Sequence, residues 1–379
     1  MPARGRRTAK QTGIVRIIDI ALSFARANVE LWISSKRSGD DMKAVVLRTF
    51  NHPIEVCEVV DPLLGSREVL VAIEAAGVCH KDVLIGDGFQ PRVGLPMVLG
   101  HEGAGRIVAI GDGVVGFSVG DRVCSLGYVP CGECLACRSG AENVCRTRQW
   151  LGEDRPGAYA ERVSFHVNAL AKIPDSVSAE DAAAATCALS TSVHGLRGLG
   201  KLQSGQTVLV TGAAGAVGTS AVQVARAMGA RVIGCDLPEK LGHIQAAGAD
   251  AALPFDGQLA SQVKELTSGQ GVDVVLDTVG TASFEQSLKM LSWGGRMVVV
   301  GNLAPAETVR LSLGPLILRQ IAILGCMNGR REDLSLALTL LSDGKLTLPP
   351  PTILPLGEAP QAHRLLRERR SVGKIFLKP

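Results

Sequence analysis

Hydrophobic and polar positions follow two different patterns along the chain. Between residues 42 and 170, short runs of β-branched and other apolar residues are separated by Gly, Pro and charged residues. These runs are KAVVL at 43–47, REVLVAIEAAG at 67–77, GRIVAIG at 105–111 and DRVCSLG at 121–127. Such closely spaced runs predict a β-rich, partly antiparallel domain.

From residue 189 onward, apolar strands alternate with amphipathic helices. The expected strand–helix pairs are 206–212 with 217–230, 231–236 with 238–249, and 272–280 with 282–292. This alternation predicts a parallel doubly wound sheet, and the fold class is therefore α/β. The last segments, 333–346 and 359–379, predict two further helices and a final strand.

The composition is that of a globular protein with about two domains. The 379 residues are 46% hydrophobic and 20% charged, whereas one domain usually holds roughly 100–200 residues. No segment reaches the roughly 18 uninterrupted apolar residues that a membrane span needs. We therefore expect a chain with no membrane-spanning segment and with a cleft between two domains.

The net charge of +4 belongs to the N-terminus. The chain has 40 Lys and Arg against 36 Asp and Glu, and the first 41 residues hold eight and four of these, so residues 42–379 are balanced. A balanced body gives no electrostatic basis for binding nucleic acid or an anionic membrane.

Residues 1–41 are interpreted as a basic N-terminal extension outside the folded core, because MKAVVLRTF from Met42 reads as a first strand. The expected location is cytoplasmic. A transit peptide is the alternative, since five basic residues precede the first acidic residue, Asp19.

A glycine-rich loop lies between a predicted strand and a predicted helix in VLVTGAAGAVGTSAVQVA, residues 208–225. Gly212, Gly215 and Gly218 form G-x-x-G-x-x-G, with Ala216 and Val217 before the last glycine. Glycines permit a tight turn and close approach of backbone N–H groups to a pyrophosphate, whose charge a helix N-terminus favours. The loop therefore predicts a dinucleotide site.

The next predicted strand, RVIGCD, ends in Asp236, 24 residues after Gly212. A carboxylate at this strand end accepts hydrogen bonds from the ribose hydroxyls of adenosine and repels a 2′-phosphate. The sequence therefore predicts NAD in preference to NADP.

Four of the ten cysteines lie in CGECLACRSGAENVC, residues 131–145. Cys131, Cys134, Cys137 and Cys145 follow C-x2-C-x2-C-x7-C. Four thiolates suit a closed tetrahedral zinc site that has no open position and so holds a loop. An iron–sulfur cluster is the competing interpretation, although a ferredoxin's fourth cysteine normally follows after three residues and precedes Pro.

A second set of metal-binding residue types is dispersed along the chain. GVCHKD contains Cys79 and Asp82, LGHEGAG contains His101 and Glu102, and AAAATCALSTSVHG contains Cys187. Two thiolates and one imidazole leave zinc a fourth position for water or substrate, which is the catalytic arrangement.

From Met42 to Pro379 the sequence resembles the zinc-containing alcohol dehydrogenases of the medium-chain dehydrogenase/reductase superfamily, through GHEGAG, the four-cysteine segment and the glycine-rich loop in this order. The resemblance implies a GroES-like β-rich catalytic domain at 42–188, a Rossmann NAD-binding domain at 189–326 and a C-terminal segment, 327–379, that completes the catalytic domain. It also implies a homodimer or homotetramer.

By the same resemblance, Cys79, His101 and Cys187 correspond to the catalytic zinc ligands and Glu102 to a conditional ligand. Asp82 corresponds to the acid that hydrogen-bonds the ligand histidine and fixes its tautomer. Thr191, four residues after Cys187, corresponds to a neighbour of the nicotinamide. The chain is then expected to hold two zinc ions, one catalytic and one structural.

The sequence departs from the family pattern beside Cys79. The usual Ser or Thr that passes the alcohol proton outward is Lys81, and Leu84 stands where the relay often ends in His. Lys81 fits two roles, proton transfer with a pKa lowered by burial, or binding of an anion. The glycine-rich loop is also closer to that of the quinone and enoyl reductases.

Three functions follow as hypotheses. The first is a zinc-dependent oxidoreductase that transfers hydride between NAD(H) and an alcohol, aldehyde or ketone. The second is a zinc-containing reductase of an enoyl thioester, such as acryloyl-CoA, or of a quinone. The third, from a different class, is a non-catalytic zinc or thiol protein, which the open three-ligand set beside a cofactor loop disfavours.

Overall fold

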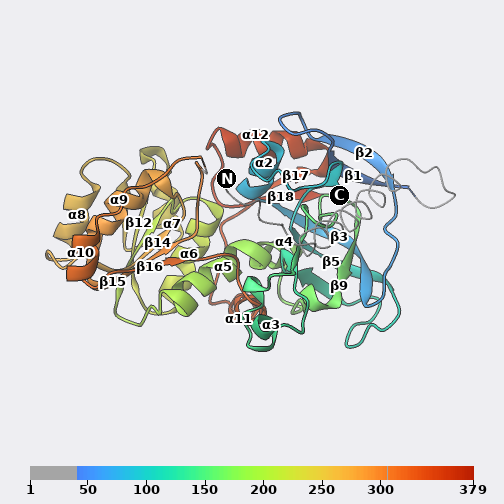
Figure 1. Ribbon diagram of the computed structural model, residues 1–379, viewed down its shortest axis with the longest axis horizontal. Coiled ribbons are helices and arrows are strands. Elements are labelled where there is room, and N and C mark those ends of the chain that lie inside the picture. The colour runs from blue at the N-terminus through green and yellow to red at the C-terminus, as the bar shows by residue number, and fades with distance from the viewer. Residues whose placement is uncertain (1–40, 305) are drawn as a thin grey trace, which may run out of the picture.

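The computed structural model describes residues 41–304 and 306–379. The basic extension with its possible transit peptide lies outside these residues, except for Asp41, which begins the first strand. Two β-sheet regions lie side by side along the long axis of the molecule (Figure 1). None of the helices within the described residues is both long enough and apolar enough to cross a membrane.

The β-rich region contains three sheets. The largest is mixed and brings together strands from both ends of the chain, in the order β10 (Leu170–Lys172), β6 (Arg122–Ser125), β5 (Glu102–Ile110), β3 (Glu68–Val78), β18 (Ile375–Lys378) and β17 (Thr352–Pro355), with β9 (Arg162–His166) also paired to β3. Smaller sheets are formed by β2 (Glu55–Val60), β1 (Asp41–Leu47) and β4 (Met97–Val98), and by β7 (Tyr128–Val129) with β8 (Gln149–Trp150).

The second region is a six-stranded sheet in which every pairing is parallel. Its order is β13 (Ala251–Pro254), β12 (Arg231–Asp236), β11 (Thr207–Thr211), β14 (Val272–Asp277), β15 (Leu291–Val299) and β16 (Ala322–Gly325). The helices that alternate with these strands are α6 (Ala216–Ala227), α7 (Leu241–Ala246), α8 (Leu259–Leu266), α9 (Thr281–Met290) and α10 (Leu313–Leu318).

Both faces of the parallel sheet are buried, as its continuous apolar strands require. Val208 and Val210 of β11 pack in the same apolar core as α6, whereas Leu209 packs on the opposite face with residues of α8 and α9. The fold is therefore doubly wound, and the predicted α/β class with a β-rich region and a parallel sheet is confirmed.

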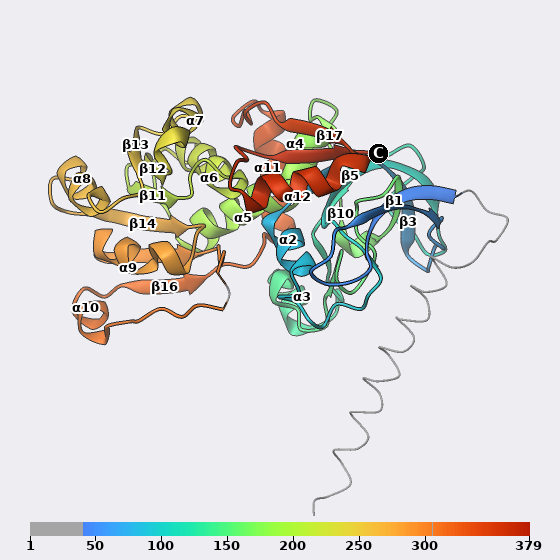
Figure 2. The same ribbon diagram turned by 90° about the horizontal axis from the view of Figure 1, so that it is seen from above.

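Helices also connect the two regions. A helical run from Ala179 to Leu199 comprises α4 (Ala179–Ala184), the π-helical turn η3 (Ala185–Leu189), α5 (Ser190–Val193) and the π-helical turn η4 (His194–Leu199). It lies between the two sheets (Figure 1). The remaining α-helices of the described residues are α2 (His80–Gly86), α3 (Leu135–Arg138), α11 (Arg331–Ser342) and α12 (Ala359–Arg367), and α12 packs along α2 (Figure 2).

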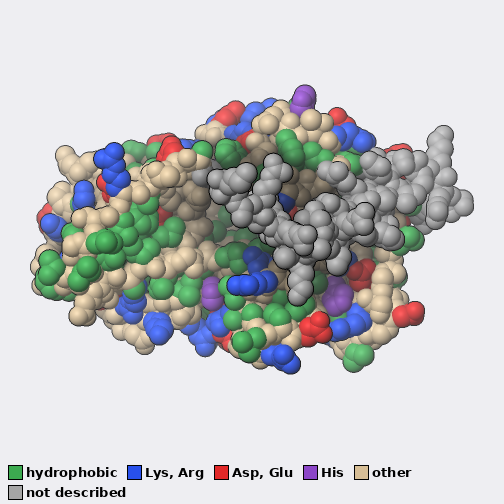
Figure 3. All heavy atoms as spheres, in the orientation of Figure 1, with side chains coloured by type: hydrophobic (Ala, Val, Ile, Leu, Met, Phe, Trp, Pro, Cys, Tyr) green, Lys and Arg blue, Asp and Glu red, His purple; other side chains and the backbone are tan. Residues whose placement is uncertain are grey.

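One end of the parallel sheet carries exposed apolar side chains. Leu313, Ile317 and Leu318 of α10 are 60%, 70% and 72% exposed, and Trp293 in β15 is 75% exposed. Figure 3 shows hydrophobic side chains gathered on this side of the molecule, around α10. The edge strand β16 has one neighbour in the described sheet, β15.

Candidate active site

Four side chains that the sequence places far apart converge in the β-rich region. Cys79, His101, Glu102 and Cys187 each bring one ligand atom to within 4.8 Å of the others. Cys79 lies between β3 and α2, while His101 and Glu102 stand at the start of β5. Because β3 and β5 pair antiparallel, with Gly77 opposite Glu102, the end of one strand meets the start of the other.

Cys187 reaches the same place from the helical run. It lies in the π-helical turn η3, within a stretch of buried alanines that lets the helix pack closely on the neighbouring sheet. A π turn widens the helix locally and is frequent at functional sites. The hydrogen bond between Cys187 and Cys79, together with the nearby His101, holds the pKa of Cys79 well below the usual thiol value.

A buried carboxylate orients two members of this group. Asp82 is fully buried and accepts hydrogen bonds from the backbone N–H of Cys79 at 3.1 Å and from the hydroxyl of Tyr159 at 2.8 Å. Its Oδ1 lies 3.0 Å from His101 Nδ1. Although burial opposes it, the contact with His101 and the hydrogen bond from Tyr159 lower the pKa of Asp82. The contact directs His101 Nε2 toward the cysteines.

A buried ion pair supports Glu102 from the other end of the chain. Lys374 Nζ lies 2.5 Å from Glu102 Oε1, and the two side chains are 9% and 0% exposed. Burial alone would lower the pKa of Lys374, but Glu102 and the two cysteines raise it above the ordinary lysine value. The ammonium therefore stays charged beside the carboxylate.

Polar atoms without partners mark the position where a ligand fits. Within the described residues, His101 Nε2, Glu102 Oε2 and Thr191 Oγ1 are buried and have no hydrogen-bond partner. Buried polar groups are normally paired, so such atoms call for an ion or a ligand. Two cysteine sulfurs with one imidazole nitrogen are the donors that zinc prefers. The residues present therefore fit a zinc ion.

Lys81 is engaged by other protein groups. Its Nζ lies 2.6 Å from Oε1 of Glu153, which is 2% exposed, and 3.9 Å from the centre of the Trp150 ring. The ion pair lowers the pKa of Glu153 against the effect of burial. Arg92 contacts the second carboxylate oxygen of Glu153 at 3.1 Å.

The glycine-rich loop has the geometry of a close backbone approach. Gly212 has φ +60°, and a Cβ on it would lie 2.4 Å from Thr278 Oγ1. A Cβ on Gly218 would lie 2.1 Å from the Gly212 carbonyl oxygen, so α6 packs directly on the loop. Gly215 caps α6, whose first residues are Ala216 and Val217.

Asp236 ends β12 beside this loop. Its Oδ2 accepts a hydrogen bond from the backbone N–H of Ala214 at 3.0 Å, and its Oδ1 accepts one from Leu237 at 2.8 Å. A second contact joins the loop to the β-rich region, because the N–H of Gly373 donates to the Ala214 carbonyl at 2.9 Å. Gly373 directly precedes Lys374, so the loop and the cysteine–histidine group share one support.

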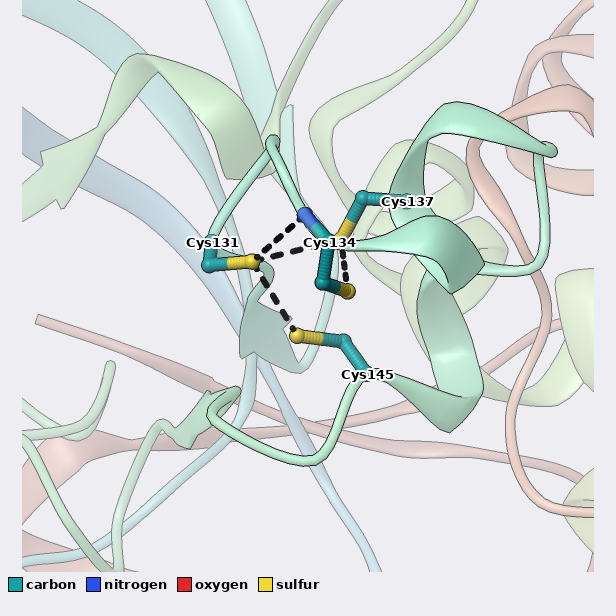
Figure 4. A group of neighbouring side chains, drawn as sticks. All are labelled: Cys131, Cys134, Cys137 and Cys145. Atoms are coloured by element: carbon teal, nitrogen blue, oxygen red, sulfur yellow. Dashed lines mark hydrogen bonds between the residues drawn. The ribbon is translucent and has the colours of Figure 1, made fainter.

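The four-cysteine segment forms a separate group (Figure 4). Neighbouring sulfurs of Cys131, Cys134, Cys137 and Cys145 lie 3.5–3.8 Å apart. Disulfide sulfurs are about 2.05 Å apart, and all ten cysteines are free. Four sulfurs bound to a tetrahedral zinc at about 2.3 Å lie about 3.8 Å from one another. The spacing therefore fits a closed zinc site.

Two family models match the chain. Residues 65–175 match the alcohol dehydrogenase GroES-like domain, and residues 216–343 match the zinc-binding dehydrogenases. The chain belongs to the zinc-containing alcohol dehydrogenase family. It is an oxidoreductase of the medium-chain dehydrogenase/reductase superfamily, as the sequence predicted.

Relatives in this family carry two kinds of name. Acryloyl-coenzyme A reductase of Metallosphaera sedula is 41% identical over 336 residues, which are 89% of this chain and 99% of the relative. An alcohol dehydrogenase of Geobacillus stearothermophilus is 38% identical over 309 residues, 80% of this chain and 90% of the relative. The crystal structure of an NAD-dependent alcohol dehydrogenase gives a TM-score of 0.84 at 36% identity, covering 89% of this chain and all of that chain.

The sequence analysis did not identify several residues that contact the predicted site residues of this chain. Lys374, Glu153 and Tyr159 contact Glu102, Lys81 and Asp82, but each lies more than 70 residues from its partner. No spacing rule connects residues at such separations. A lysine directly before the apolar final strand was the one available signal, because lysine is rarely buried without a charged partner.

Replacement of Lys374 tests the buried ion pair. Lys374→Met leaves the Glu102 carboxylate buried without a counter-charge, and we expect it to lower the free energy of unfolding by about 3–5 kcal/mol. The matched control is Lys378→Met at the end of β18, the strand that follows Lys374; its half-exposed ion pair with Glu180 should change this free energy by no more than about 1 kcal/mol. Urea denaturation measures both, and equal effects would contradict the prediction.

Proposed function

We propose that the chain is a zinc-dependent reductase that transfers hydride from a nicotinamide cofactor to the activated C=C bond of a short enoyl thioester. The convergence of Cys79, His101, Glu102 and Cys187 carries the proposal of zinc chemistry. The relative named acryloyl-coenzyme A reductase, which matches nearly its whole length at 41% identity, supports the substrate class.

The surroundings of Lys81 support the same substrate class. An alcohol dehydrogenase of this family passes the alcohol proton to a hydroxyl at this position, whereas here an ammonium pairs with Glu153 over the Trp150 ring. Lys81 and Arg92 both contact the single buried carboxylate of Glu153, so this group has a net positive charge. Net positive charge near a binding site attracts an anionic substrate such as a coenzyme A thioester.

Two zinc sites are part of the proposal. Cys79, His101 and Cys187 hold the first ion, with Glu102 close enough to approach it, and the four-cysteine segment holds the second. When bound, the first ion supplies a Lewis acid for a substrate oxygen. Asp82 keeps the proton on Nδ1 of His101, so that Nε2 is free as a ligand.

The chain's own residues position the cofactor and substrate. The loop from Gly212 to Gly218 receives the pyrophosphate at the start of α6, and Thr191 offers its unpartnered hydroxyl near the nicotinamide. The β carbon of the substrate accepts the hydride and its α carbon takes a proton from water, which leaves the saturated thioester.

An alcohol or carbonyl oxidoreductase is the second candidate, because the Geobacillus stearothermophilus relative is named an alcohol dehydrogenase. A direct comparison separates the two. We expect kcat/KM for acryloyl-CoA or crotonyl-CoA with a reduced cofactor to exceed that for primary and secondary alcohols by more than about tenfold. Alcohol oxidation without any reduction of the thioesters would reject the first candidate and favour the second.

Metal content tests the two zinc sites separately. We expect about two zinc ions per wild-type chain and about one in each of Cys79→Ser and Cys134→Ser. Cys79→Ser should lose turnover and keep its melting temperature, whereas Cys134→Ser should melt earlier because its segment loses the cross-link. Cys57→Ser, outside both groups, is the control. Elemental analysis that finds two ions in either site variant would refute the assignment.

We propose NAD(H) as the preferred cofactor, since the Asp236 carboxylate stands beside the glycine-rich loop. Asp236→Ser removes the charge that repels a 2′-phosphate, and we expect it to raise the ratio of kcat/KM for NADPH over NADH by about tenfold or more. Asp256→Ser, in the turn after β13, should leave the ratio unchanged. A wild-type enzyme that already prefers NADPH would contradict this assignment.

We also propose a homo-oligomer, because α10 exposes Leu313, Ile317 and Leu318 beside the edge strand β16. Large exposed apolar patches mark interaction surfaces, and an edge strand offers unpaired backbone groups. Sedimentation velocity at assay concentrations should show a dimer or tetramer, and a monomer there would argue against it.

A further inference from the structure

Asn328 reaches the candidate active site from a segment that the sequence did not single out. It lies between β16 and α11, and its Oδ1 is 3.9 Å from Cys187 Sγ. Its Nδ2 is buried and has no hydrogen-bond partner among residues 41–304 and 306–379. A buried amide that leaves its donor unpaired is costly unless a ligand supplies the acceptor.

The unpaired amide faces the same space as the ring of His101. A Cβ built on Gly127 would lie 3.2 Å from Asn328 Nδ2 and 3.2 Å from His101 Cδ2. Both groups therefore border a position that glycine leaves free of side-chain atoms. Asn328 thus places Oδ1 near Cys187 and Nδ2 near the ring of His101, two members of the candidate zinc group.

The four-cysteine segment and its neighbours hold the backbone around Asn328. Tyr128 donates its hydroxyl to the Gly329 carbonyl at 3.0 Å, and Asn143 donates Nδ2 to the Met327 carbonyl at 3.1 Å. Asn328 itself has φ +48°, a left-handed conformation that Asn adopts more readily than most residues. The backbone that carries the amide is therefore held on both sides of Asn328.

We propose that Asn328 Nδ2 donates a hydrogen bond to the carbonyl oxygen of the substrate during hydride transfer. In the enoyl thioester reduction on which this assignment rests, hydride adds to the β carbon and the π electrons move toward the carbonyl oxygen. Negative charge then develops on that oxygen until the α carbon is protonated and the C=O bond re-forms. A fixed N–H donor stabilises this charge more than the neutral carbonyl.

Two variants of Asn328 remove the donor in different ways. Asn328→Asp keeps the size and tolerates the left-handed backbone but has no N–H, and Asn328→Gly removes the side chain without backbone strain. We expect both to lower kcat for acryloyl-CoA by about 100-fold. The matched control is Asn51→Asp, because Asn51 is exposed and also left-handed, with φ +61°; it should keep the wild-type rate.

Three further measurements separate substrate contact from a supporting role. The proposal expects unchanged zinc content, an unchanged visible spectrum of the cobalt-substituted enzyme and an unchanged Kd for NADH by fluorescence. A rate within about threefold of wild type in both variants would overturn it. Loss of zinc, a shifted cobalt spectrum or weaker NADH binding, in proportion to the lost rate, would also overturn the proposal. Such a result would mean that Asn328 supports Cys187 or the cofactor and does not contact the substrate.

The wild-type enzyme separates this proposal from the proposed function. If wild type reduces no enoyl thioester but reduces aldehydes, the substrate class is wrong, and the same variants are then assayed on the aldehyde carbonyl. A comparable loss of kcat there, with zinc and NADH binding intact, supports the hydrogen bond to the carbonyl oxygen. Unchanged aldehyde reduction overturns it.

Discussion

The buried carboxylate of Asp82 is the constraint on which the rest of the site depends. A fully buried charge must be compensated, and here the compensation comes from the Cys79 backbone, the Tyr159 hydroxyl and the His101 ring. These contacts fix the start of α2 after β3 and the orientation of the imidazole. The side chain of Asp82 thereby positions two of the four converging residues, Cys79 and His101.

The second support comes from consecutive residues near the C-terminus. The N–H of Gly373 donates a hydrogen bond to the carbonyl of Ala214 in the glycine-rich loop, and Lys374 forms an ion pair with Glu102. The chain thus links the loop expected to receive a pyrophosphate with the group expected to hold zinc. A hydride moves only between atoms held in close and defined geometry, so this shared support has a direct chemical purpose.

The four-cysteine segment supports a neighbouring part of the chain as well as its own loop. Tyr128, before its first cysteine, and Asn143, before its last, hold the backbone on either side of Asn328. A closed site has no position for substrate, but it can stiffen the surface against which another segment packs. The structure also changes the interpretation of Lys81, whose ammonium is paired with the buried Glu153.

The fold class, the glycine-rich loop and the candidate metal-binding residues could be predicted from the sequence, because each depends on residue types at short spacing or on a motif order typical of one family. Hydrophobic periodicity distinguishes strands from helices. The C-x2-C-x2-C spacing allows three thiolates within one short loop to converge on a metal ion. The contacts between distant groups emerged only from the three-dimensional arrangement of the chain. Lys374 reaches Glu102 because β18 pairs with β3, and Asn328 reaches Cys187 because α11 packs on the helical run. Such contacts depend on the order of strands and helices in space, which no local pattern contains.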